Sequence, residues 1–464
     1  MTTSVVHCPA LFLTAPASNQ GKTTITAALA RYFTNQGKVV RVFKTGPDYL
    51  DPQILAQASK QPVEQLDIWM AGDDYCQDKL YQAAQVADLI LVEGAMGMFD
   101  GEPSSADLAV RFGIPMAIVM DVKGMAQTAA AVATGLANFR DDVQVTGLIA
   151  NRCGSERHAE LIRDALPASL PLLATLKRDE EITLPERHLG LVQADEVKDE
   201  LEIRFEAAVE WLKETQDTGL LELPTAVPFY PTNHVDAEQT IEQSLLGKTI
   251  AVAKDSAFSF IYDANLIALK NLGANVVFFS PLHDQVLPDA DALWLPGGYP
   301  ELHTKALSEN TTMRQAIKDF FQTGKGILAE CGGMLYSLDD LTDLDNQCYP
   351  MLGILEGQGA MRGKRGCQGM QTAVIPQGEI RGHAHHRSRS ANTPEPVGYG
   401  RRQRHPAPGE AIYQQKGLTA SYLHLFFPSN LDVTAKIFLG QGRSYLDEER
   451  SSLDKEHCLL DKVQ

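Results

Sequence analysis

Apolar residues in the first 200 positions gather in short continuous runs, and longer amphipathic stretches separate these runs. An uninterrupted apolar run between helical stretches is typical of a strand that is buried on both faces of a parallel sheet. The pattern predicts helices over residues 23–36 and 127–138, among others, and strands over residues 10–13, 39–44, 89–93, 116–121 and 145–151.

A second alternating series follows a region that loses its periodicity around Pro224, Pro228 and Pro231. This series predicts strands over residues 249–253, 275–279, 292–295 and 326–329. The chain is therefore expected to form two doubly wound α/β domains, the first with a mostly parallel sheet. The expected bounds are 1–215 for the first domain, 216–247 for a linker, 248–445 for the second domain and 446–464 for a charged C-terminal tail.

Composition narrows the classes of partner. The chain has 464 residues, with 41 Lys and Arg against 59 Asp and Glu, so its formal charge is 41 − 59 = −18. Nucleic acids and anionic membranes attract basic surfaces, so this acidity argues against both. No apolar run is long enough for a membrane helix, and the apolar N-terminal stretch is predicted to be a strand rather than a signal peptide. Seven cysteines without a Cys-x-x-Cys pair favour a reducing cytoplasm over disulfides or a zinc site.

The strongest local signal is FLTAPASNQGKTT, in which an apolar strand runs into a small polar loop and Gly21-Lys22-Thr23-Thr24 opens a helix. Backbone N–H groups in such a loop hold phosphate oxygens, a lysine neutralises their charge, and the Thr23 hydroxyl is suited to bind Mg²⁺. Pro16 replaces the first glycine of the usual P-loop pattern. The strand–loop–helix context still predicts a nucleotide phosphate site.

Two acidic loops follow the next two long apolar strands. One is KTGPDYLDP, with Asp48 and Asp51, and the other is VEGAMGMFDG, with Glu93 and Asp100. Ligands of open α/β sheets bind beyond the carboxyl ends of the strands, where acidic side chains can hold Mg²⁺ beside phosphates. A single such Asp is more often a turn or cap residue. Four carboxylates at two strand ends favour a functional site, led by Glu93, which directly ends its strand.

A second candidate site lies around Cys331, in GILAECGGM, between a predicted strand and a predicted helix. A cysteine on such an elbow is exposed as a nucleophile, and the helix N-terminus is expected to lower its thiol pKa. The Pro-Gly-Gly turn of LWLPGGYPE, which contains Gly298, is expected to offer backbone N–H groups to an oxyanion. The leading candidate for the base is His424, in ASYLHLFF, and the other six cysteines are interpreted as inert.

Each half resembles a known group of enzymes. The P-loop with its two acidic loops resembles the dethiobiotin-synthetase-like group, which uses ATP to activate a carboxylate. Partition-type and nitrogenase-type ATPases carry a further lysine where this chain has Ala17, which argues against that subgroup. The Pro-Gly-Gly turn, cysteine elbow and late histidine resemble triad-type class I glutamine amidotransferases, whose domain is flavodoxin-like. Many of those enzymes have a Glu where this chain has Phe426, so the group that orients His424 is open.

Taken together, the motifs resemble the cobyrinate a,c-diamide synthase family over essentially the whole chain to about residue 440. The matching stretches include the P-loop, KTGPDYLDP, VEGAMGMFDG, NRCGSERH, GLVQADE, AVAKDSAFSFIYDANL, LPGGYPELH, AECGGM, RGHAHH and ASYLHL.

The resemblance implies ATP- and glutamine-dependent amidation of the a and c carboxylates of cobyrinate or hydrogenobyrinate in cobalamin biosynthesis, with Mg²⁺ as cofactor. It implies catalysis by Cys331 and His424, with an oxyanion held by the N–H groups of Gly298 and Gly332. The further implied sites are ATP binding by Gly21, Lys22, Thr23, Thr24 and Asn151, metal binding by Thr23, Asp48 and Glu93, and substrate or ATP contacts from Tyr49, Asp51, Asp100 and His383.

Several alternatives stay open. The acceptor could be another tetrapyrrole such as Ni-sirohydrochlorin, or the chain could be a CTP-synthase-like ligase. A non-enzymatic P-loop switch protein would not need Cys331. The preference for ATP over GTP and the oligomeric state are not fixed, with a homodimer as one option. His383, His385 and His386 have no Cys or acid in the same motif, so a solvated loop or a substrate contact is favoured over a metal site.

The acidity of the chain is not uniform. Residues 362–404 contain nine Arg or Lys and two acids, a local charge of +7, so the remaining chain carries −18 − 7 = −25. This segment is either a solvated loop region or a place where guanidinium groups bind a polycarboxylate substrate.

Overall fold

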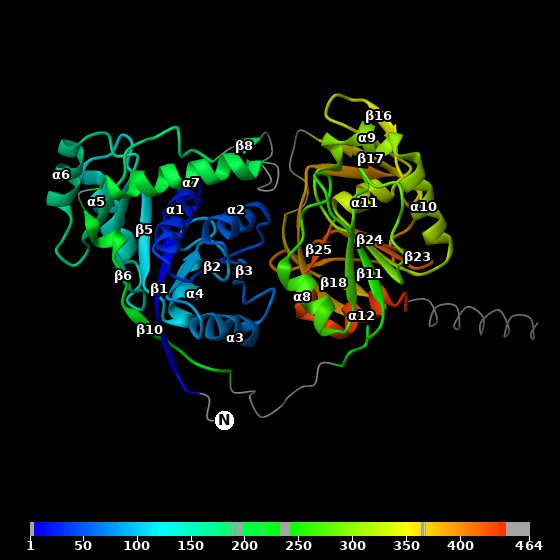
Figure 1. Ribbon diagram of the computed structural model, residues 1–464, viewed down its shortest axis with the longest axis horizontal. Coiled ribbons are helices and arrows are strands. Elements are labelled where there is room, and N and C mark those ends of the chain that lie inside the picture. Colours follow the sequence, from blue (N-terminus) through cyan, green and yellow to red (C-terminus); the bar gives the residue numbers. More distant parts are fainter. Residues whose placement is uncertain are drawn as a thin grey trace, which may run out of the picture. The chain divides into compact units, whose positions relative to one another are not determined.

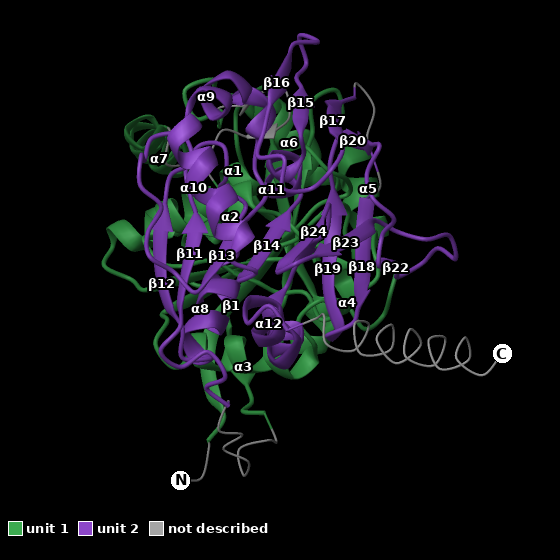
Figure 2. Cartoon of the chain, turned by 90° about the vertical axis from the view of Figure 1, so that its right-hand side faces the viewer, with its two compact units in different colours: residues 1–238 green, residues 239–464 purple. Residues whose placement is uncertain are grey.

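The computed structural model describes residues 4–184, 186–187, 190–191, 197–215, 217–232, 242–362, 366 and 368–441. The chain divides into two compact units, Met1–Glu238 and Gln239–Gln464, which Figure 2 shows in different colours. The tail expected at 446–464 lies outside the described residues, as do residues 233–241 of the expected linker.

A parallel sheet forms the centre of unit 1 (Figure 1). Its strand order is β3-β2-β4-β1-β5-β6-β7. Every neighbouring pair in this order is parallel, as the continuous apolar runs predict. The strands are β1 (Val6–Thr14), β2 (Val40–Lys44), β3 (Glu64–Gln65), β4 (Leu89–Glu93), β5 (Met116–Asp121), β6 (Val145–Asn151) and β7 (Leu172–Thr175).

Helices cover both faces of this sheet, because successive side chains of a strand point to opposite faces. In β1, Leu11 and Leu13 belong to one apolar core, and Ala10 and Phe12 belong to the other. The helices of the first core are α1 (Lys22–Asn35), α2 (Leu50–Ser59) and α7 (Lys198–Lys213), and those of the second are α3 (Asp73–Ala84), α4 (Ser105–Phe112), α5 (Gln127–Ala137) and α6 (Glu156–Ala165).

Part of the segment expected to be a linker contributes to unit 1. Strand β10 (Ala226–Phe229) pairs antiparallel with the first residues of β1, where Val6 faces Phe229. This strand has four residues and contains Pro228, so it shows no apolar periodicity. Short elements precede it, namely β8 (Glu186–Arg187), β9 (Gly190–Leu191) and the 3-10 helix η2 (Thr218–Leu221).

Unit 2 is built on a sheet in the order β12-β11-β13-β14-β24-β23-β21. Its first five strands are parallel, and β23 and β21 continue it in antiparallel pairs. The strands are β11 (Thr249–Ala253), β12 (Asn275–Phe279), β13 (Ala292–Leu295), β14 (Gly326–Glu330), β21 (Gly398–Tyr399), β23 (Ala411–Gln415) and β24 (Leu418–Ser421).

Two smaller sheets of unit 2 have no counterpart in the sequence prediction, in the orders β22-β18-β19-β25 and β16-β15-β17-β20. All neighbouring pairs in them are antiparallel except β15 with β17. Their strands are β15 (Asp340–Thr342), β16 (Cys348–Pro350), β17 (Gln358–Met361), β18 (Gln368–Ile375), β19 (Gly378–His385), β20 (Ser388–Ala391), β22 (Arg401–Arg402) and β25 (His424–Leu425).

The central sheet of unit 2 also separates two apolar cores. Ala251 and Ala253 of β11 face one core, and Ile250 and Val252 face the other. The helical elements of the unit are α8 (Asp263–Asn271), η3 (Pro300–Leu302), α9 (Thr304–Glu309), α10 (Thr311–Gln322), α11 (Gly332–Ser337), η4 (Phe427–Ser429) and α12 (Leu431–Phe438). Within the described part of the chain, no helix combines the length and apolar character that a bilayer crossing requires.

The packing of α7 on α1 gives a stability prediction. Phe205 of α7 is 1% exposed and lies beneath the Arg31 guanidinium, at 5.2 Å from its ring centroid. Replacing Phe205 with Ala should lower the free energy of unfolding of unit 1 by about 3–5 kcal/mol, because a large cavity is left. Ile203→Ala is the matched control on the same helix, since Ile203 is 72% exposed. Its effect should stay within about 0.5 kcal/mol in urea unfolding, and equal losses would contradict the packing described.

Candidate functional site

The phosphate-binding loop of unit 1 leads from β1 into α1, and Gly21 precedes the first helical residue. Gly21 has φ 93°, and a Cβ placed there would lie 2.3 Å from Nδ2 of Asn151. Only glycine fits this position, because of both the positive φ and the close Asn151 side chain. Asn151 ends β6 and donates its Nδ2–H to the Gln20 carbonyl at 2.9 Å. Asn151, which is expected to contact ATP, therefore holds the phosphate-binding loop in place from the end of β6.

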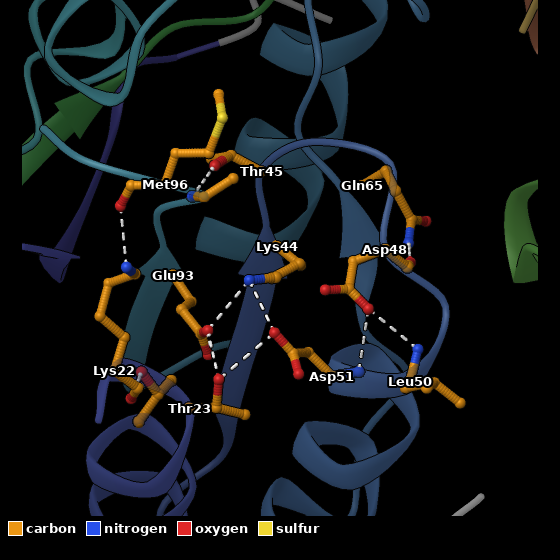
Figure 3. Close-up of polar contacts among 12 residues, drawn as sticks. Lys22, Thr23, Lys44, Thr45, Asp48, Leu50, Asp51, Gln65, Glu93 and Met96 are labelled. Atoms are coloured by element: carbon orange, nitrogen blue, oxygen red, sulfur yellow. Dashed lines mark hydrogen bonds and ion pairs between the residues drawn. The ribbon is translucent and has the colours of Figure 1, made fainter. Parts of the chain in front are cut away.

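Lys22 opens α1 and is buried. Its Nζ donates to the Met96 carbonyl at 2.8 Å (Figure 3). It also donates to the Ala17 carbonyl at 3.4 Å. Burial lowers the pKa of Lys22 to about 8, and the neighbouring Lys44 lowers it further while Glu93 opposes both. Anionic phosphate oxygens would be stronger partners for this ammonium than the two carbonyls are. Thr24, the third residue of α1, is half-buried.

Four side chains converge beside Lys22, at the carboxyl ends of β2 and β4 (Figure 3). Lys44 Nζ lies 2.9 Å from Asp51 Oδ2 and 3.0 Å from Glu93 Oε1. The Thr23 hydroxyl donates to Glu93 Oε1 at 2.8 Å, and Asp51 Oδ2 lies 3.3 Å from the same hydroxyl. We call Thr23, Lys44, Asp51 and Glu93 the carboxylate cluster.

Burial and the neighbouring charges shift the pKa values of this cluster. Burial raises the pKa of Glu93, while Lys44 opposes that shift. Burial would lower the pKa of Lys44, but Asp51 and Glu93 outweigh it, and the pKa of Lys44 is raised. Glu93 Oε2 is buried and has no hydrogen-bond partner among the described residues. The cluster therefore presents carboxylate and hydroxyl oxygens, one of them unsatisfied, which fits a hard cation such as Mg²⁺.

The other acidic residues of the two loops have local partners. Asp48 Oδ1 accepts from the backbone N–H groups of Leu50 at 3.0 Å and Asp51 at 3.1 Å, so it caps α2. Burial and the Asp51 carboxylate raise the pKa of Asp48 to about 7. Asp100 Oδ2 accepts from the Gly97 N–H at 3.2 Å and shapes its own loop. Tyr49 is buried at the start of α2.

Lys44 is the member of the cluster that the sequence reasoning missed. It ends β2 directly opposite Glu93 in the parallel register. A lysine that ends an apolar strand next to a strand ending in Glu is a signal for a buried ion pair, and it was present in the sequence. Among the described residues, no group of three or more His, Cys, Asp or Glu side chains could hold a metal alone. A nucleotide-bound Mg²⁺ needs only one or two carboxylates.

The cysteine elbow of unit 2 has the expected strand-to-helix position. Cys331 lies between β14 and α11 with φ 46° and ψ −100°, a conformation that non-glycine residues rarely adopt. Its N–H donates to the Ser421 carbonyl at 2.8 Å, which ties the elbow to β24. A Cβ on Gly332 would lie 2.9 Å from the Gly298 nitrogen, and one on Gly298 would lie 2.1 Å from the Ala257 carbonyl oxygen. Gly332 therefore lets the elbow approach the Pro-Gly-Gly turn closely, and Gly298 lets that turn approach the backbone of Ala257.

The expected lowering of the thiol pKa is wrong for this structure. Burial raises the pKa of Cys331, and the carboxyl groups of Glu301 and Glu410 raise it further. The Gly332 N–H acts in the opposite direction but does not compensate. The reason is desolvation, because Cys331 is only 5% exposed and a buried thiolate loses its hydration. The thiol is therefore neutral at rest, and a base would have to remove its proton before the sulfur could act as a nucleophile.

His424 lies on β25 against the Pro-Gly-Gly turn, since a Cβ on Gly297 would lie 2.3 Å from His424 Cε1. Burial lowers the pKa of His424 to about 3, with smaller contributions from His386 and His385. Its imidazole is therefore neutral, which is the form that accepts a proton. His383 faces His424 across the β19–β25 pair, with ring centroids 5.0 Å apart and an interplanar angle of 15°.

The solvated loop expected for the RGHAHH motif is wrong, because residues 381–385 belong to β19. His383 is buried, 3.5 Å from the Tyr262 hydroxyl, so its side chain lies in the core of the glutaminase candidate. His386 is also buried, and its Nε2 lies 3.0 Å from Glu410 Oε1. The motif lacked an acid in sequence, but the fold supplies Glu410 from a distant segment.

Comparison with protein families gives two matches, one for each unit. Residues 11–192 match the CobQ/CobB/MinD/ParA nucleotide binding domain, and residues 249–431 match the CobB/CobQ-like glutamine amidotransferase domain. These matches confirm the predicted fold class of two α/β units, with a P-loop domain followed by a glutamine amidotransferase domain.

Curated relatives match nearly the whole chain. The hydrogenobyrinate a,c-diamide synthase of Stutzerimonas stutzeri is 49% identical over 424 residues, covering 91% of this chain and 97% of the relative. The enzyme of the same name from Pseudomonas aeruginosa is 48% identical, covering 93% and 97%. The cobyrinate a,c-diamide synthase of Herminiimonas arsenicoxydans is 45% identical, covering 91% and 94%. With its two units in the same order as the two matched domains, this chain belongs to the cobyrinate and hydrogenobyrinate a,c-diamide synthase family.

Proposed function

We propose that this chain catalyses the ATP- and glutamine-dependent amidation of the a and c carboxylates of hydrogenobyrinate or cobyrinate in cobalamin biosynthesis. The observation that carries the proposal is the presence, in one chain, of a P-loop with a carboxylate cluster and a strained cysteine elbow beside a Pro-Gly-Gly turn. Family membership supports the same reaction.

In unit 1, ATP would bind with its phosphates on the loop that ends at Gly21 and on the N-terminus of α1. Lys22 Nζ would exchange the Met96 and Ala17 carbonyls for phosphate oxygens. Thr23, Asp51 and Glu93 would hold Mg²⁺, which neutralises phosphate charge when it is bound. A substrate carboxylate oxygen attacks the γ-phosphorus, ADP leaves, and an acyl phosphate forms.

In unit 2, the Cys331 sulfur attacks the side-chain amide carbon of glutamine while His424 takes the thiol proton. The backbone N–H groups of Gly298 and Gly332 would hold the oxyanion of the tetrahedral intermediate. His424 then gives its proton to the departing nitrogen, which leaves as ammonia, and water hydrolyses the thioester to glutamate. The ammonia attacks the acyl carbon of the acyl phosphate, and phosphate leaves.

The basic segment at 362–404 is a candidate for contacts to a polycarboxylate. Arg389 lies exposed on β20. Arg401, by contrast, makes hydrogen bonds of 2.9 and 2.7 Å to both oxygens of Glu379. Arg389 is therefore the better of these two candidates for a substrate carboxylate. Lys364 and Arg365 of this segment lie outside the described residues.

Replacing Cys331 with Ser tests the assignment of the nucleophile. Glutamine-dependent amidation should fall by at least about 1000-fold, because a serine hydroxyl is a far weaker nucleophile beside this base. Amidation driven by added ammonium chloride should keep the wild-type rate, since unit 1 is unchanged. Both rates are measured by ADP release. Unchanged glutamine use would refute the role of Cys331 as the nucleophile.

A pair of variants tests which aspartate helps to bind Mg²⁺. The geometry favours Asp51, which faces Thr23 and Lys44, over Asp48, which caps α2. Asp51→Asn should raise the Mg²⁺ concentration for half-maximal ATP use at least about tenfold. Asp48→Asn is the matched control and should change it less than twofold, because Asn caps a helix about as well as Asp. A large shift in Asp48→Asn alone would restore Asp48 as the metal ligand.

The acceptor is identified by incubating the protein with ATP, glutamine and one tetrapyrrole at a time. Hydrogenobyrinic acid should be converted to its diamide, because two relatives at 48–49% identity carry the name of that reaction. Mass spectrometry detects each replacement of a carboxyl hydroxyl by an amino group. Faster conversion of cobyrinic acid or Ni-sirohydrochlorin would move the assignment to that acceptor. The absence of product from all three tetrapyrroles would refute the substrate proposal.

A further inference from the structure

A buried carboxyl group lies directly before the cysteine elbow. Glu330 is the last residue of β14, is 2% exposed and precedes Cys331 in the chain. Burying a carboxyl group is costly unless hydrogen bonds satisfy it. The proposed reaction gives this group no role, so its presence calls for an explanation.

Both oxygens of Glu330 accept a hydrogen bond from a residue close to another catalytic element. Oε2 accepts from the Trp294 indole N–H at 2.8 Å, and Oε1 accepts from the Leu425 backbone N–H at 2.7 Å. Trp294 belongs to β13, which leads into the Pro-Gly-Gly turn, and Leu425 directly follows His424. One carboxyl group thus joins the strands that carry the nucleophile, the oxyanion turn and the base.

Core packing alone does not require this group. Trp294 and Leu425 belong to the apolar core that α8 and α12 cover. Replacing both partners of a buried polar or charged pair with well-packed apolar groups is often neutral or stabilising for the fold, whereas removing one partner leaves the other unsatisfied. The hydrogen bonds of Glu330 are specific instead, because they fix one indole and one backbone N–H relative to the elbow.

We infer that Glu330 is a positioning residue of the glutaminase site, which holds β13, β14 and β25 so that Cys331, His424 and the Gly298 turn keep their reacting geometry. This inference rests on the proposed function of unit 2. Glu330 would do part of the work of the acidic residue that Phe426 replaces in this chain. It acts on the backbone next to the base, however, and not on the imidazole ring.

Loss of the Glu330 hydrogen bonds would change the distances between the reacting groups. A displacement of about 1 Å between a nucleophile and its base can cost about 100-fold in rate. Burial raises the pKa of Glu330 to about 8, and its two N–H donors oppose this shift. Its two N–H contacts, rather than a charge presented to His424, therefore connect it to the site.

The test compares variants of the full chain in glutamine hydrolysis. Glu330→Leu removes both acceptors and should lower kcat about 100-fold with KM within about threefold, because the reacting groups shift while the glutamine contacts remain. Glu330→Gln keeps one carbonyl acceptor for Leu425 and should retain more activity than Glu330→Leu. Trp294→Phe removes only the indole donor and should give a smaller loss than Glu330→Leu.

Thr434→Val is the matched control. Thr434 is 0% exposed, and its hydroxyl donates to the carbonyls of Phe427 at 3.2 Å and Asn430 at 2.9 Å. Thermal unfolding of every variant separates lost stability from lost geometry. The inference predicts that Glu330→Leu loses far more kcat than Thr434→Val for a similar fall in Tm. A kcat within about threefold of that control, or losses that follow Tm alone, would overturn it.

Two further measurements distinguish a failure to fold and a missing glutaminase activity from a failure of this inference. If Glu330→Leu does not fold, the comparison of Glu330→Gln and Trp294→Phe with the control replaces it, and wild-type kcat in both would overturn the inference. Amidation driven by ammonium chloride should be unchanged in all variants. A wild-type chain without glutamine hydrolysis would instead refute the proposed function of unit 2, an outcome distinct from normal hydrolysis in the Glu330 variants.

Discussion

The need to satisfy a carboxyl group buried at the end of a central parallel strand shapes both units. Glu93 ends β4 and Glu330 ends β14, and both side chains are almost completely inaccessible to solvent. A strand covered on both faces cannot hydrate such a group, so neighbouring elements must supply donors. In unit 1 the donors are Lys44 and Thr23, and in unit 2 they are Trp294 and Leu425. Each candidate site is built around that compensation.

The two arrangements differ in a way that fits the chemistry proposed for each site. Glu93 keeps one buried oxygen without a hydrogen-bond partner among the described residues, and its other oxygen meets a lysine that Asp51 also contacts. Such an arrangement can exchange partners when phosphates and a cation arrive. Both oxygens of Glu330 already accept short hydrogen bonds from the protein. A fully satisfied group of this kind holds its surroundings in place, as a preorganised nucleophile and base require.

The sequence predicts many strands of the two large sheets well, because their apolar residues lie next to one another in the chain. The strands at 89–93, 116–121, 145–151, 275–279 and 292–295 have the predicted bounds, and each contains a run of apolar residues. Strand β10 and the two smaller sheets escaped prediction because their strands are short or mix polar with apolar residues, so no local periodicity marks them. The same holds for the site, where the pattern indicated the acidic loops but not that Asp48 caps α2 while Asp51 reaches Thr23.

The thiol pKa shows why local motifs give the identity of a group but not its charge. A helix N-terminus favours a thiolate, yet full burial and the nearby Glu301 act against it, and only tertiary packing decides between them. Cys331 and His424 are both neutral at rest, so the proton transfer proposed between them would create an ion pair in a buried place. That pair is stabilised only when donors and partners are already aligned, since little water is present to reorganise. A site that generates its charge during the reaction therefore depends more on fixed backbone geometry than one that holds a preformed thiolate.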